Sequence, residues 1–137
     1  MYLLDTDTVI YSLKGEPAVK KNLRNHFHDP MKMSVITLME LYYGAHKSLK
    51  IVSNLAKIKT LELSFEIISI SEESAEIFGM TKAHLEKAGS PLDDFDLIIA
   101  SSALSNNLVL VTNNVRHFQR IEGLKLTNWT EYPPEKP

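Results

Sequence analysis

The chain has 137 residues, of which 44% are apolar and 23% are charged, and its formal charge is −2. This balance is typical of one ordinary globular domain and excludes a disordered or fibrous chain. There is no cysteine, which excludes disulfides, thiolate metal ligands and a cysteine nucleophile. The chain starts without a basic leader and has no apolar run near the roughly 18 residues of a membrane span. We therefore expect a cytoplasmic protein with no membrane partner.

Short apolar runs alternate along the chain with segments of helical spacing. A strand is expected at residues 2–4, helices at 6–13 and 17–28, a strand at 33–36, helices at 37–47 and 51–63, a strand at 65–70, helices at 71–88 and 91–104, and strands at 108–111 and 124–126. This alternation predicts an α/β fold in which helices cover both faces of a mainly parallel sheet of four to five strands. The proline-rich residues 132–137 are expected to form a disordered tail.

The charged residues are unevenly distributed. Nine Lys or Arg residues and only three acids lie between Lys14 and Lys59, whereas nine acids and two lysines lie between Thr60 and Asp96. A nearly neutral protein can therefore present one basic face, which is what binding to phosphates requires. The alternative is a set of solvated helix faces of differing charge.

Several polar residues follow the ends of predicted strands. Asp5 directly follows the first strand, Glu40 is expected in the first turn of the helix after the second strand, and Thr112 and Asn114 follow the fourth. In parallel sheets these ends share one edge, where ligands bind. Asp96 lies early in a helix and can join the others if the N-terminus of that helix points to the same edge.

Helix capping is the structural alternative for each of these acids. Residues 37–40 and 90–93 both match a capping box, and Asp5 can cap the helix that follows it. One residue is enough for a cap, which contributes about 1 kcal/mol. Capping accounts for Asp93, whereas Asp96 lies past the cap and borders an apolar run. We therefore expect Asp93 to start the helix and Asp96 to serve the site.

Asp5, Glu40 and Asp96, if brought together, would form a site of hard oxygen ligands. Such a site suits Mg²⁺ or Mn²⁺. A cation bound there can lower the pKa of a bound water and neutralise charge on a phosphoryl oxygen.

Four segments then resemble, in order, the successive motifs of PIN-domain ribonucleases. They are LLDTDTVIYSLKG, SVITLMELYYGA, PLDDFDLIIASSA and LVLVTNNVRHFQRIEGL, and together they span nearly the whole chain. The sequence is most similar to the VapC-type toxins of type II toxin–antitoxin pairs. This resemblance implies one PIN-like nuclease domain over residues 1–131, built as a three-layer α/β/α sandwich. It also implies an endoribonuclease that depends on Mg²⁺ or Mn²⁺.

The resemblance also implies roles for individual residues. The acids that match the catalytic and metal-binding positions are Asp5, Glu40 and Asp96, and the supporting residues are Thr6, Asp7, Thr112 and Asn114. Many family members carry a further acid where this chain has an amide, which is a weaker cation ligand and argues against a fully occupied second metal site. Similar toxins cut RNA, often a transfer RNA, and form homodimers. A cognate VapB-type antitoxin inhibits them by covering the active site with its C-terminal segment.

Three other interpretations fit parts of the sequence. A haloacid-dehalogenase-like phosphatase would explain Asp5-Thr6-Asp7-Thr8, but it needs aspartates after Thr112, where the chain has none. A response-regulator receiver would need a phosphoacceptor aspartate after the third strand, which ends in serine. A catalytically inactive PIN fold that acts as a binding module remains the main alternative.

Overall fold

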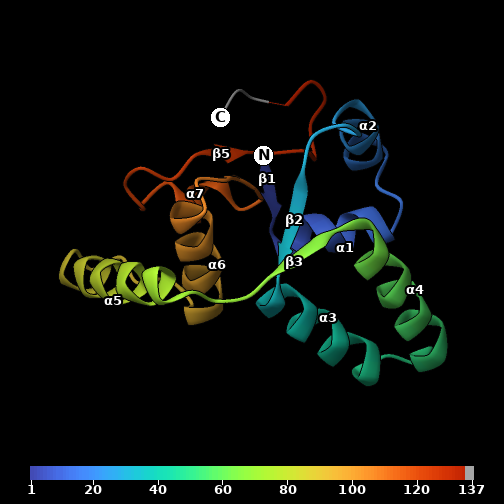
Figure 1. Ribbon diagram of the computed structural model, residues 1–137, viewed down its shortest axis with the longest axis horizontal. Coiled ribbons are helices and arrows are strands. Elements are labelled where there is room, and N and C mark those ends of the chain that lie inside the picture. The colour runs from blue at the N-terminus through green and yellow to red at the C-terminus, as the bar shows by residue number, and fades with distance from the viewer. Residues whose placement is uncertain (135–137) are drawn as a thin grey trace.

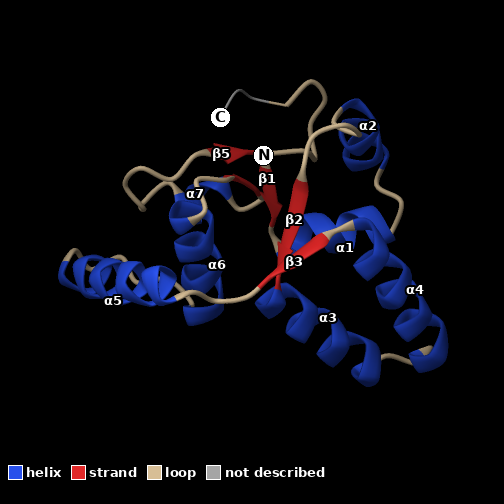
Figure 2. Cartoon of the chain, in the orientation of Figure 1, coloured by secondary structure: helices blue, strands red, loops and turns tan. Residues whose placement is uncertain are grey.

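The computed structural model describes residues 1–134 and contains a five-stranded sheet with the strand order β3-β2-β1-β4-β5. All four strand pairs are parallel, as the alternating pattern predicts. Figure 2 shows the short strands at the centre of the molecule. The strands are β1 (Tyr2–Leu4), β2 (Met31–Ser34), β3 (Glu66–Ile68), β4 (Val109–Val111) and β5 (Leu126–Thr127).

Helices cover both faces of this sheet, which confirms the predicted three-layer α/β/α arrangement. Figure 1 shows α5 and α6 on one side of the sheet and α1, α3 and α4 on the other. The helices are α1 (Thr6–Leu13), α2 (Pro17–Asn25), α3 (Val35–Lys47), α4 (Ile51–Ser64), α5 (Glu72–Lys87), α6 (Asp94–Ser105) and α7 (Val115–Phe118).

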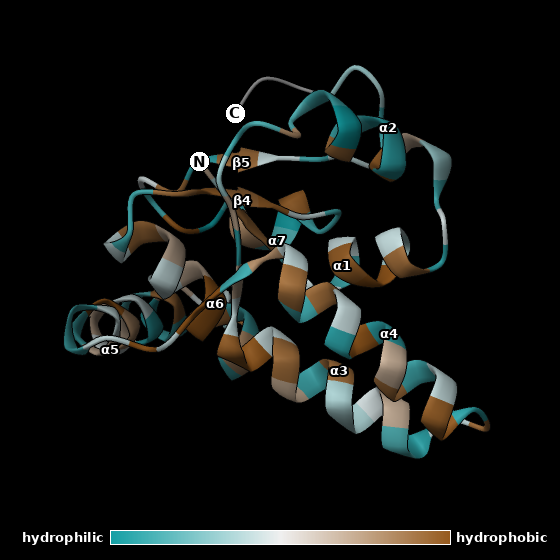
Figure 3. Cartoon of the chain, turned by 45° about the vertical axis from the view of Figure 1, so that its right-hand side comes forward, coloured by the Kyte–Doolittle hydropathy of each residue, from teal (hydrophilic) through white to brown (hydrophobic). Residues whose placement is uncertain are grey.

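The central strands are apolar on both sides, so the sheet separates two hydrophobic cores. Leu3 and Leu110 pack into the core that contains α5 and α6 residues, whereas Leu4 and Val111 pack into the core that contains residues of α1, α3 and α4. Successive strand residues point to opposite faces, so a continuous apolar run supplies both cores at once. Figure 3 shows the hydrophobic colouring of β4 and the mainly hydrophilic colouring of α2.

The boundary between β2 and α3 differs from the prediction. The strand ends at Ser34, and the helix begins at Val35 rather than at Thr37. Ser34 is the N-cap, because its hydroxyl accepts a hydrogen bond from the amide of Ile36 at 3.1 Å. The β-branched pair Val35-Ile36 favours a strand locally, but the serine cap and packing against the core place it in the first helical turn.

Smaller differences occur elsewhere in the chain. The helix predicted from residue 91 begins at Asp94, the one predicted to end at residue 28 ends at Asn25, and the last strand lies at Leu126–Thr127 rather than 124–126. The short helix α7 was not predicted.

Within residues 1–134, no helix is both long and apolar enough to cross a membrane. Of the predicted tail, residues 132–134 form neither helix nor strand, and residues 135–137 lie outside the described part of the chain.

Candidate active site

The site lies at the carboxyl edge of the parallel sheet, where β1, β2 and β4 all end. The register pairs Leu4 with both Met33 and Val111, so the residues that follow these strands emerge side by side. The amide of Asp5 continues the ladder by donating to the carbonyl of Val111 at 2.9 Å. The predicted meeting of Asp5 and Thr112 at this edge is therefore observed.

Asp5 caps a helix with one carboxylate oxygen and contacts Thr112 with the other, so the cap does not use up the carboxylate. Its Oδ1 accepts a hydrogen bond from the amide of Thr6 at 2.9 Å, which caps α1. Its Oδ2 accepts one from the hydroxyl of Thr112, also at 2.9 Å. Only 4% of the residue is exposed. Burial raises the pKa of Asp5 to about 7, and the charge of Asp7 acts in the same direction, although the two hydrogen bonds oppose the rise.

Glu40 lies in the second turn of α3 and is held by a threonine from another element. Because α3 begins at Val35, the predicted capping box at residues 37–40 is wrong, and Glu40 is not needed at the helix N-terminus. Its Oε1 instead accepts a hydrogen bond from the hydroxyl of Thr6 at 2.8 Å. The Thr6 hydroxyl is also 3.0 Å from that of Thr37. Thr6 therefore links the cap of α1 to the acid on α3.

Asp7 turns toward the loop after β4. Its Oδ2 accepts a hydrogen bond from the amide of Asn113 at 3.1 Å, and its Oδ1 accepts one from the hydroxyl of Thr8 at 3.2 Å. Burial raises the pKa of Asp7, and the hydrogen bonds from Thr8 and Asn113 oppose the rise. Asp7 thus joins the start of α1 to the end of β4.

Asp96 lies in the first turn of α6, separate from the two acids that precede it. Asp93 is the N-cap, because its carboxylate accepts a hydrogen bond from the amide of Phe95 at 3.1 Å. Asp94 is exposed and forms an ion pair with Lys82 at 3.0 Å. Burial raises the pKa of Asp96, and the charges of Asp93 and Glu40 raise it further. The expected cap at Asp93 is therefore observed, and Asp96 lies past the cap, partly buried and near the charge of Glu40.

Thr112 and Asn114 complete the edge, together with a histidine that the sequence analysis did not select. The buried Thr112 hydroxyl accepts a hydrogen bond from the amide of Asn114 at 2.9 Å while donating to Asp5. The side chain of Asn114 lies 3.0 Å from Nδ1 of His117 in α7. The charge of His117 opposes the rise in the pKa of Asp96. The sequence could have pointed to His117 only if α7 had been predicted, because a helical turn brings residues three positions apart together.

The chemistry of these side chains suits a hard divalent cation. Asp5, Asp7, Glu40 and Asp96 are oxygen donors, and they influence one another electrostatically as like charges do. Within residues 1–134, however, no three acidic or histidine side chains are already gathered as a metal-binding group. The donor set thus fits Mg²⁺ or Mn²⁺, and the carboxylates would have to draw together to bind it.

Comparison with known proteins gives a consistent answer. The PIN domain family matches residues 2–124. The chain is 38% identical to the tRNA(fMet)-specific endonuclease VapC of Salmonella typhimurium, an alignment that covers 93% of this chain and 97% of that protein. It is 39% identical to the ribonuclease VapC2 of Haemophilus influenzae, with the same coverage of each chain.

The fold of this chain is also similar to solved structures of the same kind of protein. The fold superposes with a TM-score of 0.88 on a chain of VapBC2 from Rickettsia felis bound to a promoter DNA fragment, at 35% identity over 93% of this chain and 98% of that one. It superposes with a TM-score of 0.86 on a chain of VapBC-1 from nontypeable H. influenzae, at 34% identity over 95% of this chain and 98% of that one. The chain therefore belongs to the PIN-domain family and, within it, to the VapC ribonucleases of toxin–antitoxin systems.

Proposed function

We propose that this protein is an endoribonuclease toxin that hydrolyses RNA phosphodiester bonds with the help of Mg²⁺ or Mn²⁺. The observation that supports this most directly is the set of acids at the carboxyl edge of the sheet. Asp5, Glu40 and Asp96 come from three different elements, yet they lie close enough for the charge of one to shift the pKa of another. Capping explains neither Glu40 nor Asp96.

Asp5, Glu40 and Asp96 would hold the cation, which when bound supplies an activated water and neutralises charge on the phosphate. Thr6 and Thr112 orient two of these acids, since their hydroxyls donate to Glu40 at 2.8 Å and to Asp5 at 2.9 Å. Fixed hydroxyl donors of this kind hold carboxylates in a productive arrangement. Asp7 and Asn114 support the loop after β4. Because Asn114 is an amide, the residues favour one well-held cation.

The partner proposed for this toxin is a VapB-type antitoxin. Relatives from S. typhimurium and R. felis were solved as VapBC complexes. A C-terminal antitoxin segment that covers the site would meet the carboxylates of Asp5, Glu40 and Asp96, so a basic side chain on that segment would complement them. We further propose that the toxin acts as a homodimer and that a transfer RNA is among its substrates, as the name of the S. typhimurium relative suggests.

The test is cleavage of total bacterial RNA by wild type and two matched variants on α6. With Mn²⁺, wild type should release discrete fragments, and EDTA should stop the reaction. Asp96→Asn should abolish cleavage without unfolding the protein, whereas Asp93→Asn should retain it because asparagine also caps helices. Cleavage by Asp96→Asn at the wild-type rate would contradict the proposal.

A second measurement separates this proposal from an inactive PIN-fold binding module. A cation that binds only the folded state raises the melting temperature by mass action. Manganese should therefore raise the melting temperature of wild type but not that of Asp96→Asn. If neither RNA cleavage nor a manganese-induced shift occurs in wild type, the binding module becomes the better interpretation.

A further inference from the structure

The single turn α7 is fixed beside the helix that carries Asp96. Phe118 at the end of α7 is fully buried, in the core cluster that also holds residues of α6. Just after α7, Nη1 of Arg120 donates to the carbonyl of Pro91 at 3.1 Å, which ties this part of the chain to the segment before α6. The buried ring and this hydrogen bond hold α7 beside α6 and the segment that precedes it.

One nitrogen of the His117 ring is held by the protein, and the other is not. The ring is exposed, and its Nδ1 lies 3.0 Å from the side-chain nitrogen of Asn114. An amide nitrogen can only donate, so Nδ1 is the acceptor and the neutral ring carries its hydrogen on Nε2. Among the described residues, none accepts a hydrogen bond from Nε2. The fold therefore orients the ring and leaves Nε2 free to donate to a ligand.

The His117 ring lies close enough to the acids to act on them. Its charge opposes the rise in the pKa of Asp96. Asn114, which holds the ring, also donates from its amide to Thr112, whose hydroxyl donates to Asp5. A chain of three hydrogen bonds therefore leads from His117 to Asp5. His117 thus lies at the rim of the same edge of the sheet as the acids.

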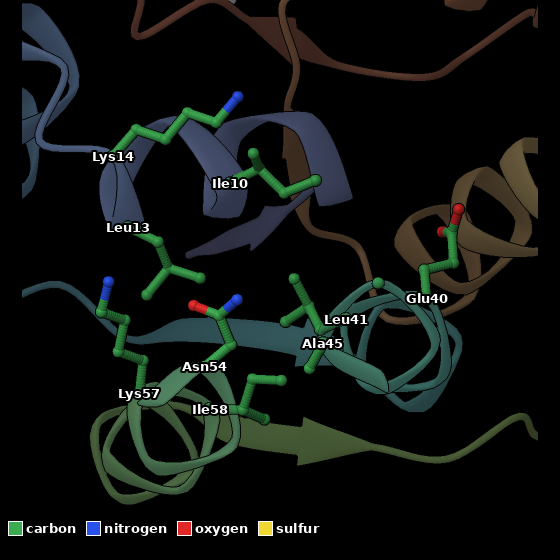
Figure 4. Close-up of a pocket in the computed structure, with 10 residues that line it drawn as sticks. Ile10, Leu13, Lys14, Glu40, Leu41, Ala45, Asn54, Lys57 and Ile58 are labelled. Atoms are coloured by element: carbon green, nitrogen blue, oxygen red, sulfur yellow. The ribbon is translucent and has the colours of Figure 1, made fainter. Parts of the chain in front are cut away.

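The lysines on neighbouring elements do not offer a comparable donor. Lys82 on α5 forms an ion pair with Asp94 at 3.0 Å. Lys14 and Lys57 line the same cavity as Glu40, but Figure 4 shows them on the side of the cavity away from Glu40. His117 is therefore better placed than these lysines to reach a substrate held at the acids.

We propose that His117 is a further catalytic residue for RNA cleavage, and that its Nε2 donates a hydrogen bond to a non-bridging oxygen of the scissile phosphate. This inference rests on the proposed nuclease function and adds a residue to its mechanism. In the hydrolysis, a water oxygen bonds to phosphorus and loses a proton to solvent, while the bond from phosphorus to a sugar oxygen breaks and that oxygen takes up a proton. The non-bridging oxygens carry the negative charge of the phosphate, so a donor already held beside them stabilises the transition state.

The first experiment compares the rates at which wild type, His117→Ala and His117→Gln cleave total bacterial RNA with Mn²⁺, over a range of RNA concentrations. His117→Ala should lower the maximal rate about tenfold or more, because the loss of one preorganised donor can cost about 100-fold to 1000-fold in kcat. His117→Gln should recover part of the rate, because its side-chain amide also donates an N–H. The control is His28→Ala, an exposed histidine between α2 and β2 at the amino edge of the sheet, which should cleave as wild type does.

Melting temperatures separate this catalytic role from two others. If His117 only held the loop after β4 in place, His117→Ala would lower the melting temperature of the metal-free protein. If His117 were a ligand of the cation, His117→Ala would lose the rise in melting temperature that manganese causes. A catalytic contact predicts that both melting temperatures equal those of wild type, and either of the other results would overturn the inference.

A second experiment detects the phosphate contact without any cleavage. Adenosine 5′-monophosphate carries a phosphate but no phosphodiester bond, and NMR can follow the ring nitrogens of the histidines as it is added with Mg²⁺. The Nε2 signal of His117 should shift in wild type, while the signals of His28 stay unchanged. No shift at His117 in millimolar nucleotide would contradict the proposed contact.

The results also separate this inference from the proposed function. If wild type cleaves RNA and His117→Ala cleaves it at the same rate, the proposed function stands and the inference fails. If wild type cleaves no RNA with Mn²⁺, the proposed function fails and the catalytic role of His117 fails with it. Slower cleavage by His117→Ala, together with unchanged melting temperatures and a shifted Nε2 signal, would support the inference.

Discussion

The burial of Asp5 predicts that the metal-free protein loses stability as the pH rises. The folded state raises the pKa of this carboxyl from 3.8 to about 7, because burial and the charge of Asp7 disfavour ionisation. The folded state therefore keeps a proton that the unfolded chain releases. The associated stability is fully present below pH 4 and is lost as the pH rises through 7.

The size of this loss follows from the two pKa values. Between them, stability falls by about 1.4 kcal/mol per pH unit, because one proton leaves on unfolding. From pH 5 to pH 8 the pKa values of 3.8 and about 7 predict a loss of roughly 2 to 3 kcal/mol for Asp5 alone. Asp7 and Asp96, whose pKa values are also raised, would add to the same trend. For a domain of this size, the loss corresponds to a melting temperature about 10 °C lower at pH 8.

The assay is urea unfolding of wild type and Asp5→Asn at pH 5 and pH 8, in EDTA. Asp5→Asn keeps the oxygen that caps α1 but removes the ionisable group, so its stability should change much less between the two pH values. The control is Asp94→Asn, an exposed residue on α6, which should retain the wild-type difference. Manganese should restore part of the lost stability to wild type at pH 8 and little to Asp5→Asn.

Two results would refute this reasoning. Wild type that is as stable at pH 8 as at pH 5 would mean that water reaches Asp5 and that its carboxyl is not held in a buried site. An equal loss in wild type and Asp5→Asn would assign the pH dependence to other groups.

Three further predictions concern the residues around the acids and the C-terminal segment. Thr112→Val removes the hydroxyl that donates to Asp5 at 2.9 Å. Urea unfolding should therefore show about 1 kcal/mol more destabilisation at pH 8, where Asp5 is charged, than at pH 5. Thr6→Val removes the donor to Glu40, and RNA cleavage rates should fall about tenfold with little change in melting temperature. Trp129→Ala should cost about 3 to 5 kcal/mol in the free energy of unfolding, because the side chain is 1% exposed and stacks on His26.

Much of the fold could be predicted from the sequence because its local patterns agree with the final structure. Apolar runs such as Tyr2–Leu4 and Val109–Val111, alternating with helical segments, are typical of a parallel sheet covered on both faces, and that sheet is observed. The parallel arrangement in turn places Asp5 and Thr112 at one edge. The separation of Asp93 from Asp96 also followed from the chain alone, since one residue is enough to cap a helix.

Only the tertiary structure decided how the acids are held. The hydrogen bond from Thr112 to Asp5 joins residues 107 positions apart, and the one from Thr6 to Glu40 joins residues 34 apart. Such contacts depend on how β1 and β4 pair and on how α1 packs against α3, which no local pattern encodes. The start of α3 shows the same limit, because Val35-Ile36 favours a strand locally, whereas packing against the core helps to place it in the first helical turn.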